Sequence, residues 1–84
     1  MAKLRILSAR GDSVVEWDSK LADTGDPEAS AAVKEAERIF EEQREHGATA
    51  FVVTPGKPAE RVDSFNPSAS EIIMVPRVAG GAGG

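Results

Sequence analysis

Hydrophobic and polar residues alternate in the first part of the chain in a pattern typical of paired β-strands. Residues 3–8 have the sequence Lys-Leu-Arg-Ile-Leu-Ser, which places Leu4 and Ile6 on one face of a half-buried strand. The Ala-Arg-Gly-Asp sequence that follows is rich in turn formers, and residues 13–17 form a second short run with apolar residues. The pattern predicts an antiparallel hairpin over residues 3–17.

The next part of the chain predicts one amphipathic helix, after a polar, irregular loop at residues 18–25. Asp26 is a good N-cap, Pro27 suits the first helical position, and Gly47 predicts the C-cap, directly after His46 in the last turn. Between these ends, apolar residues recur every three or four positions and form one stripe that is expected to face a sheet. They are Ala29, Ala32, Val33, Ala36, Ile39 and Phe40.

Two further strands and a loop follow the predicted helix. Residues 49–54, Thr-Ala-Phe-Val-Val-Thr, predict a third strand, and the Pro-Gly-Lys-Pro sequence after it predicts a tight turn. Residues 59–62 are then expected to return antiparallel to this strand. The polar segment 63–68 is a predicted loop with Phe65 as its buried anchor.

The last fourteen residues divide into an apolar half and a glycine-rich half. Residues 71–78 are rich in β-branched side chains, which predicts a strand buried on both faces, in the middle of the sheet and parallel to residues 3–8. Residues 79–84 contain only alanine and glycine and predict a flexible tail. The expected organisation is one α+β domain over residues 1–78, in which one helix packs on a four- or five-stranded mixed sheet.

Composition narrows the classes of function. The 84 residues include no cysteine and one histidine, and the net charge is −4. These numbers predict no disulfide, a reducing cytoplasmic location, no metal centre and no nucleic-acid partner. No long apolar segment predicts a signal peptide or a membrane span. His46 has no nucleophile or orienting acid that the sequence can indicate, so the protein is not expected to be an enzyme.

The most specific motif runs from Phe65 to Gly81, with the sequence Phe-Asn-Pro-Ser-Ala-Ser-Glu-Ile-Ile-Met-Val-Pro-Arg-Val-Ala-Gly-Gly. A polar bend, an apolar last strand and a Gly-Gly ending, together with the predicted order of hairpin, helix and strand, resemble the ubiquitin-like proteins. They also resemble the small sulfur carriers of molybdopterin and thiamin biosynthesis. The resemblance implies a β-grasp fold. The amino-acid sequence of the motif is more similar to the sulfur carriers, and the position of the helix directly after the hairpin is more similar to ubiquitin.

The resemblance also implies a function. In these families an adenylating enzyme uses ATP and magnesium to activate the carboxylate of a terminal glycine, which is then conjugated to a target or converted to a thiocarboxylate. The domain itself would bind no cofactor and would work as a monomer. The implied working residues are the tail glycines, and Arg77 and Val78 are the predicted partner-binding residues. The tail glycines are Gly80, Gly81, Gly83 and Gly84.

The chain departs from the families' pattern after Gly81, where the residues Ala-Gly-Gly follow. Either Gly84 is the working end or a processing peptidase cuts after Gly81. Three interpretations of the tail stay open. The protein is a modifier, with a conjugating enzyme as a further partner, or it is a sulfur carrier. In the third interpretation the tail is a plain extension on a non-conjugated β-grasp module such as a phage tail-assembly protein. Among the other residues, Trp17 and Phe51 are expected in the core rather than in a binding patch. The sequence selects no lysine as a chain acceptor.

Overall fold

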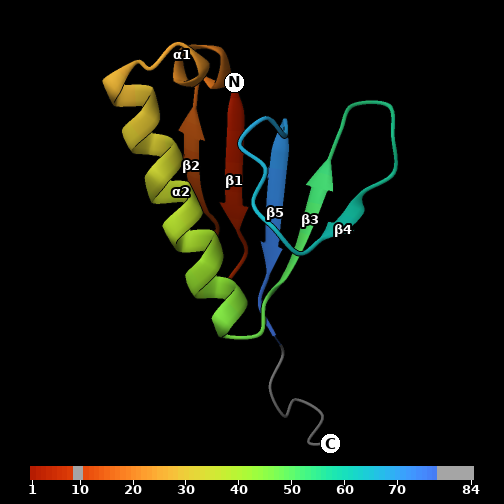
Figure 1. Cartoon of the computed structure of the whole chain (residues 1–84). Helices are drawn as coiled ribbons and strands as arrows, with labels where there is room; N and C mark the ends of the chain where they lie inside the picture. The colour runs from red at the N-terminus through yellow and green to blue at the C-terminus, as the bar shows by residue number, and fades with distance from the viewer. Residues whose placement is uncertain (9–10, 78–84) are drawn as a thin grey trace, which may run out of the picture.

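The computed structural model describes residues 1–8 and 11–77 of the chain. Figure 1 shows two strands, a short helix, a long helix and three further strands in chain order. The elements are β1 (Ala2–Ile6), β2 (Ser13–Trp17), α1 (Ser19–Asp23), α2 (Pro27–Glu45), β3 (Thr49–Val53), β4 (Glu60–Val62) and β5 (Glu71–Val75).

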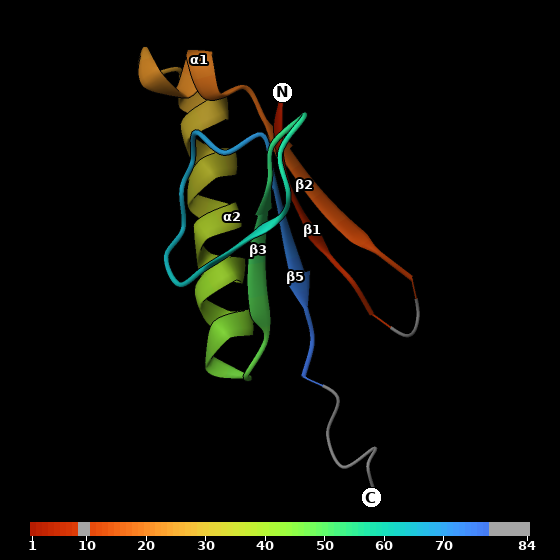
Figure 2. The same ribbon diagram turned by 90° about the vertical axis from the view of Figure 1, so that its right-hand side faces the viewer.

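The five strands form one mixed sheet in the order β2-β1-β5-β3-β4. β1 and β5 are parallel, whereas β1 with β2, β3 with β5 and β3 with β4 are antiparallel. Figure 2 shows both helices on one side of this sheet, which gives a two-layer α+β architecture. The predicted hairpin, the antiparallel return and the central position of the last strand, parallel to the first, are all confirmed.

The helix α2 begins and ends almost where the sequence predicts. The carboxylate of Asp26 accepts a hydrogen bond of 2.9 Å from the backbone N–H of Ala29, and Pro27 is the first helical residue. At the other end the cap is His46, one residue before the predicted cap, and Gly47 follows it at φ +89°. A glycine in this left-handed conformation directly after the cap ends many helices, because it has no Cβ to strain the backbone.

The predicted loop at residues 18–25 contains the short helix α1, so the loop prediction is wrong there. Asp18 is the N-cap, and its Oδ1 accepts hydrogen bonds from the backbone N–H groups of Lys20 and Leu21 at 3.0 and 3.1 Å. A five-residue helix with no buried side chain has no apolar stripe. The only sequence signal for it is therefore the capping aspartate.

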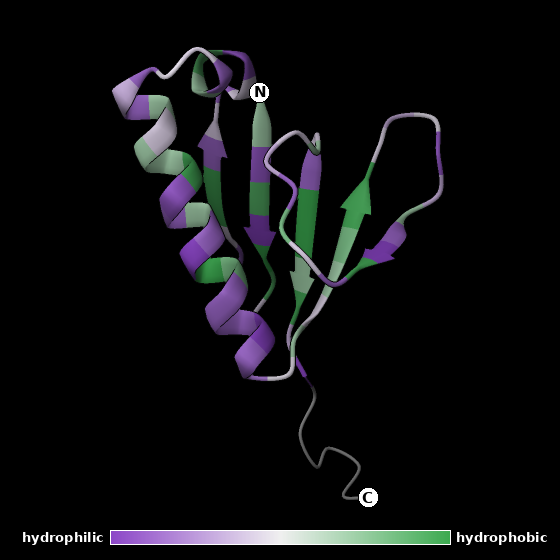
Figure 3. Ribbon diagram, in the orientation of Figure 1, coloured by the Kyte–Doolittle hydropathy of each residue, from purple (hydrophilic) through white to green (hydrophobic). Residues whose placement is uncertain are grey.

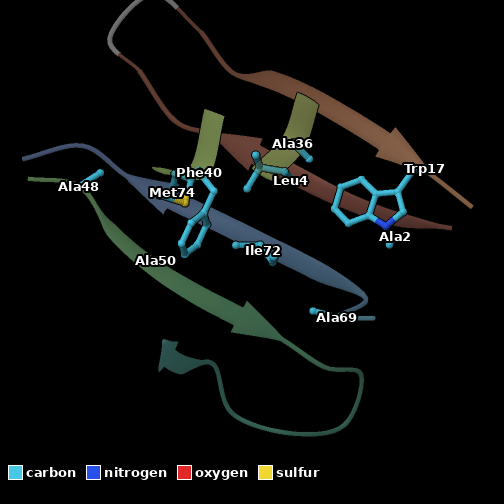
Figure 4. Close-up of a cluster of buried hydrophobic side chains, with 10 residues drawn as sticks. All are labelled: Ala2, Leu4, Trp17, Ala36, Phe40, Ala48, Ala50, Ala69, Ile72 and Met74. Carbon is cyan, nitrogen blue, oxygen red and sulfur yellow. The ribbon is translucent and has the colours of Figure 1, made fainter. Parts of the chain in front are cut away.

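The core lies between α2 and the sheet. In Figure 4, Ala36 and Phe40 of α2 lie over buried side chains of the central strands. Their neighbours from the strands include Leu4, Trp17, Ala50, Ile72 and Met74, each with an exposed fraction of 2% or less. The prediction that Trp17 belongs to the core is confirmed.

An aromatic cluster ties the loop before β5 to this core. The ring of Phe65 lies 5.7 Å from the rings of both Trp17 and Phe40, measured between centroids. The indole Nε1–H of Trp17 donates a hydrogen bond of 3.0 Å to the carbonyl oxygen of Pro67. Phe65 therefore anchors the loop as the sequence predicts, although it is half-buried rather than buried, and its contacts fix the chain just before it enters β5.

The strand β5 differs from its prediction on one face. It ends at Val75, and only Ile72 and Met74, which point toward the helix, are buried. Glu71, Ile73 and Val75 point to the other face and are half-buried, because no helix among the described residues covers that face (Figure 2). Figure 3 shows that β5 is mostly hydrophobic, and this composition led to the wrong expectation of burial on both faces.

Candidate functional site

The candidate site predicted from the sequence is the end of β5, where the chain leads into its glycine-rich segment. In Figure 1 this end lies beside the C-terminal end of α2, at the opposite end of the domain from the N-terminus. Pro76 and Arg77, which follow the strand, are exposed. Val78 and the tail glycines Gly80, Gly81, Gly83 and Gly84 lie outside the described residues.

Arg77 packs against the turn that ends α2. A Cβ atom added to Gly47 would lie 3.0 Å from Cδ of Arg77 and 3.5 Å from its Cβ. The aliphatic stem of the arginine therefore lies directly over the bare Cα of the glycine. A glycine is favoured at position 47 for two reasons, its positive φ and this close approach of a side chain.

The guanidinium of Arg77 is on the exposed surface of the domain. Within the described ranges 1–8 and 11–77 it makes no hydrogen bond or ion pair, although its stem is packed. Arg44, on the last turn of α2, contrasts with it, because it donates to the carbonyl oxygen of Ala48 at 3.2 Å and pairs with Asp63 at 3.2 Å. A planar guanidinium on a packed stem suits the binding of a carboxylate on another protein.

The sequence could not have predicted the contact between Gly47 and Arg77. The sequence marks Gly47 only as the end of a helix and Arg77 only as a charge at the end of a strand. The two residues are brought together by the antiparallel pairing of β3 with β5, which places Thr49 opposite Val75. The other singled-out residue near this end, His46, is exposed and caps the helix.

The uncovered face of the sheet combines apolar and charged side chains. Phe51 lies opposite Ile73 on this face, outside the core cluster, so its predicted place in the core is wrong. Nε of Arg5 lies 3.4 Å from the carboxylate of Glu71, but the geometry is not that of a hydrogen bond. This face is therefore stabilised by side-chain packing and by an ion pair without hydrogen-bond geometry.

The shifted pKa values lie on the outer surface of α2. A hydrogen bond of 2.9 Å from Arg38 lowers the pKa of Glu35, and the same contact raises the pKa of Arg38. Both side chains are exposed, and a second carboxylate, that of Glu42, lies 3.5 Å from Arg38. This arrangement is an ordinary helix-surface network of pairs three and four residues apart, and it suggests no acid–base chemistry.

Among the residues that the structure describes, no group of three or more His, Cys, Asp or Glu side chains is placed to hold a metal ion. In the same part of the chain, neither helix combines the length and the apolar character needed to cross a bilayer.

Comparison of the chain with protein-family models, with curated proteins and with solved structures finds no match.

Proposed function

We propose that this protein is a ubiquitin-like modifier of β-grasp fold, activated through a C-terminal glycine by an adenylating enzyme and then conjugated to a target. The strand order β2-β1-β5-β3-β4, with β1 parallel to β5 and one long helix between the hairpin and β3, supports the β-grasp assignment. A single main helix over one face of the sheet supports it as well.

One observation carries the functional proposal: the strand that precedes the glycine-rich segment is the central strand of the sheet. β5 is paired along its length with β1 on one side and with β3 on the other. The chain therefore leaves the domain from its most firmly held strand. A rigid body with an attached run of residues lacking bulky side chains suits a substrate whose end must enter a narrow enzyme channel.

The chemistry belongs to the partner enzyme. A carboxylate oxygen of the terminal glycine forms a bond to the α-phosphorus of ATP, the bond from that phosphorus to the bridging oxygen breaks, and pyrophosphate leaves with its magnesium. A thiolate then attacks the acyl carbon of the adenylate and AMP leaves, and an amine of the target attacks the resulting thioester, which forms the amide and releases the thiol. This chain contributes the carboxylate, a domain for the enzyme to hold, and the cation of Arg77 beside the point of exit.

The direct test measures ATP-dependent pyrophosphate release by a candidate adenylating enzyme from the same genome. Chains ending at Gly84, at Ala82, at Gly81 and at Gly80 are compared. We expect release with the chain that ends at the working glycine and loss when that glycine is removed. Pyrophosphate release with all four chains would overturn the proposal. So would the absence of release with every adenylating enzyme of that genome, and either result would favour a non-conjugated module.

The product separates a modifier from a sulfur carrier. A modifier gives an amide or ester adduct with a target, whereas a sulfur carrier gives a thiocarboxylate on the chain itself. Intact mass of the chain after activation, with and without a sulfur donor, distinguishes these outcomes. We propose the modifier because the long helix α2 follows the hairpin with only the short α1 between them, which is nearer to the element order of ubiquitin.

Two glycine variants test the role assigned to Arg77. Gly47 and Gly56 both have positive φ, at +89° and +78°, so alanine strains the backbone at either position. Only at Gly47 would the new Cβ meet Arg77. We expect Gly47→Ala and Arg77→Ala to lower the rate of adenylation several-fold relative to Gly56→Ala. Equal rates in all three variants would show that the enzyme does not use this cation.

A further inference from the structure

A shallow hollow of about 210 Å³ lies at the end of the domain opposite Arg77. It is bounded by the N-terminus, the end of β2, α1 and the first turns of α2, which meet at the top of Figure 1. Its lining residues are Met1, Glu16, Trp17, Asp18, Leu21, Asp26, Glu28, Ala29 and Ala32.

The hollow collects exposed apolar side chains. In the part of the chain that the structure describes, the large hydrophobic residues that are exposed are Met1, Val14 and Leu21, at 80%, 46% and 47%. Two of these three line the hollow, and Trp17, which is 2% exposed, closes its floor. Neighbouring exposed apolar groups around a depression are a feature of surfaces that bind a partner's side chain.

The rim of the hollow is acidic. Four of its lining residues are Asp or Glu, and none is Lys or Arg. Asp18 and Asp26 serve as helix N-caps. Glu16 and Glu28 are exposed, and neither carboxylate forms an ion pair within residues 1–8 and 11–77. Lys3 lies opposite Glu16 in the register of β1 with β2, and the α-amino group of Met1 is also near, so the four acidic residues still outnumber these two cations.

Two other hollows differ from this one, because each has a lysine or an arginine in its lining. The hollow of about 270 Å³ between the helices has Lys34 as well as Asp23 in its lining. The hollow of about 250 Å³ near the C-terminal end of α2 contains Arg44, which is paired with Asp63. In both, a cation of the chain itself balances acidic neighbours.

From this juxtaposition we propose that the hollow binds a basic segment of a partner protein, in which a bulky aliphatic side chain is flanked by Lys or Arg. The aliphatic side chain would contact Leu21 and Met1 above the tryptophan floor. The flanking cations would meet Glu16 and Glu28, so that charge complementarity selects the partner.

The position of the hollow leaves the other end of the domain free. The 19 residues of α2 span about 28 Å at the α-helical rise, and the hollow lies at their N-terminal end while Arg77 lies at their C-terminal end. A partner in the hollow would therefore not block an enzyme at the tail. The proposal does not depend on the activation chemistry, and either can fail alone.

The test uses the full chain and the probe peptide acetyl-Lys-Leu-Lys-Leu-Lys-amide, with a Glu-for-Lys peptide and a Ser-for-Leu peptide as controls. Trp17 is the single tryptophan of the chain, so its fluorescence reports on the floor of the hollow. Backbone amide NMR shifts locate the binding. We expect the basic, aliphatic peptide to shift the emission of Trp17 and the amides of Leu21 and Glu28, with affinity that falls as salt is added.

Variants separate the contributions of the hollow. Leu21→Ser and the pair Glu16→Gln with Glu28→Gln should each weaken binding by about tenfold. Glu37→Gln, on the exposed surface of α2 and outside the hollow, is the matched control and should leave binding unchanged. Because Leu21 is already half-exposed, its substitution should leave the fold intact, and circular dichroism checks this.

Several outcomes would overturn the proposal. They are equal binding of the acidic and basic peptides, binding that survives both sets of substitutions, amide shifts located elsewhere, or no binding at low salt. A concentration-dependent dimer in sedimentation that is broken by Leu21→Ser would assign the hollow to a second copy of the chain instead.

Discussion

The two faces of the sheet are built from alternate residues of the same strands, yet they differ in burial and in polarity. The face under α2 carries Leu4, Ile72 and Met74, each 0% exposed. The uncovered face carries Arg5, Glu71 and Ile73 at the intervening positions, and all three are half-buried. The alternation follows from the strand geometry, since successive side chains point to opposite faces.

This difference shows where the stability of a small domain is concentrated. A chain of 84 residues has one thin core, and the single long helix can cover only one face of a five-stranded sheet. Substitutions on the covered face should therefore cost much more than substitutions of the same kind on the other.

Ile72→Ala and Ile73→Ala are neighbouring, chemically identical changes on opposite faces of β5. Ile72→Ala should lower the free energy of unfolding by about 2–5 kcal/mol, since it leaves a cavity in the core. Ile73→Ala should cost about 1 kcal/mol, because its side chain is only partly removed from water. Urea unfolding measures both. Equal costs would mean that the open face is covered in solution, for example by another copy.

Trp17→Phe tests the edge of the covered face. The change removes part of the buried indole and the hydrogen bond to Pro67, so we expect a loss of about 1–3 kcal/mol. Val14→Ala, an exposed position on the same strand, is the matched control and should change stability by less than about 0.5 kcal/mol. Thermal unfolding followed by circular dichroism compares them. A loss for Trp17→Phe no greater than the control's would contradict its assigned role.

The ion pair between Arg5 and Glu71 tests the uncovered face by itself. The two side chains are 36% and 20% exposed and 3.4 Å apart, without hydrogen-bond geometry. A double-mutant cycle with Arg5→Ala and Glu71→Ala should give a coupling below about 1 kcal/mol that shrinks with salt. A coupling that is larger and insensitive to salt would show that this face excludes water far better than its exposure indicates.

The smallest effect is expected at Glu35, on the outer surface of α2. Because Arg38 holds the pKa of Glu35 below the ordinary value of 4.5, the stabilisation is present above that pH and is lost as pH falls through the lowered pKa. Glu35→Gln should remove this small, acid-dependent part of the stability. Glu37→Gln is the control and should leave the pH dependence of stability unchanged. Urea midpoints measured between neutral and acidic pH check the sign. A Glu35→Gln protein that gained stability above pH 4.5 would contradict it.

The elements with strong local signals could be predicted from the sequence. Asp26, Pro27 and the apolar stripe gave the start and the buried face of α2, and the β-branched run before Pro76 gave the central strand. The helix α1 could not be predicted with the same rules, because Leu21 is exposed and the segment has no apolar periodicity. A continuous apolar run such as Glu-Ile-Ile-Met-Val also does not reveal whether one or both faces will be covered.

The candidate site was predictable only in part. The glycine-rich ending and Arg77 are visible in the sequence, but the contact that holds the stem of Arg77 depends on Gly47, a residue brought near only by strand pairing. The hollow at the other end has no sequence motif. It arises because the N-terminus, the end of β2 and two helix starts converge, and each contributes only one to four residues.

The central strand is also the last of the five to be synthesised. The β1–β2 hairpin and the β3–β4 pair do not bond to each other, and only β5 joins them, through pairings such as Lys3 with Glu71 and Phe51 with Ile73. Before residues 71–75 emerge from the ribosome, the strands can pair only within these two units, and an isolated two-stranded hairpin is marginally stable at best. The sheet can close only when residues 71–75 have been made, so a chain terminated before β5 would not form the five-stranded sheet.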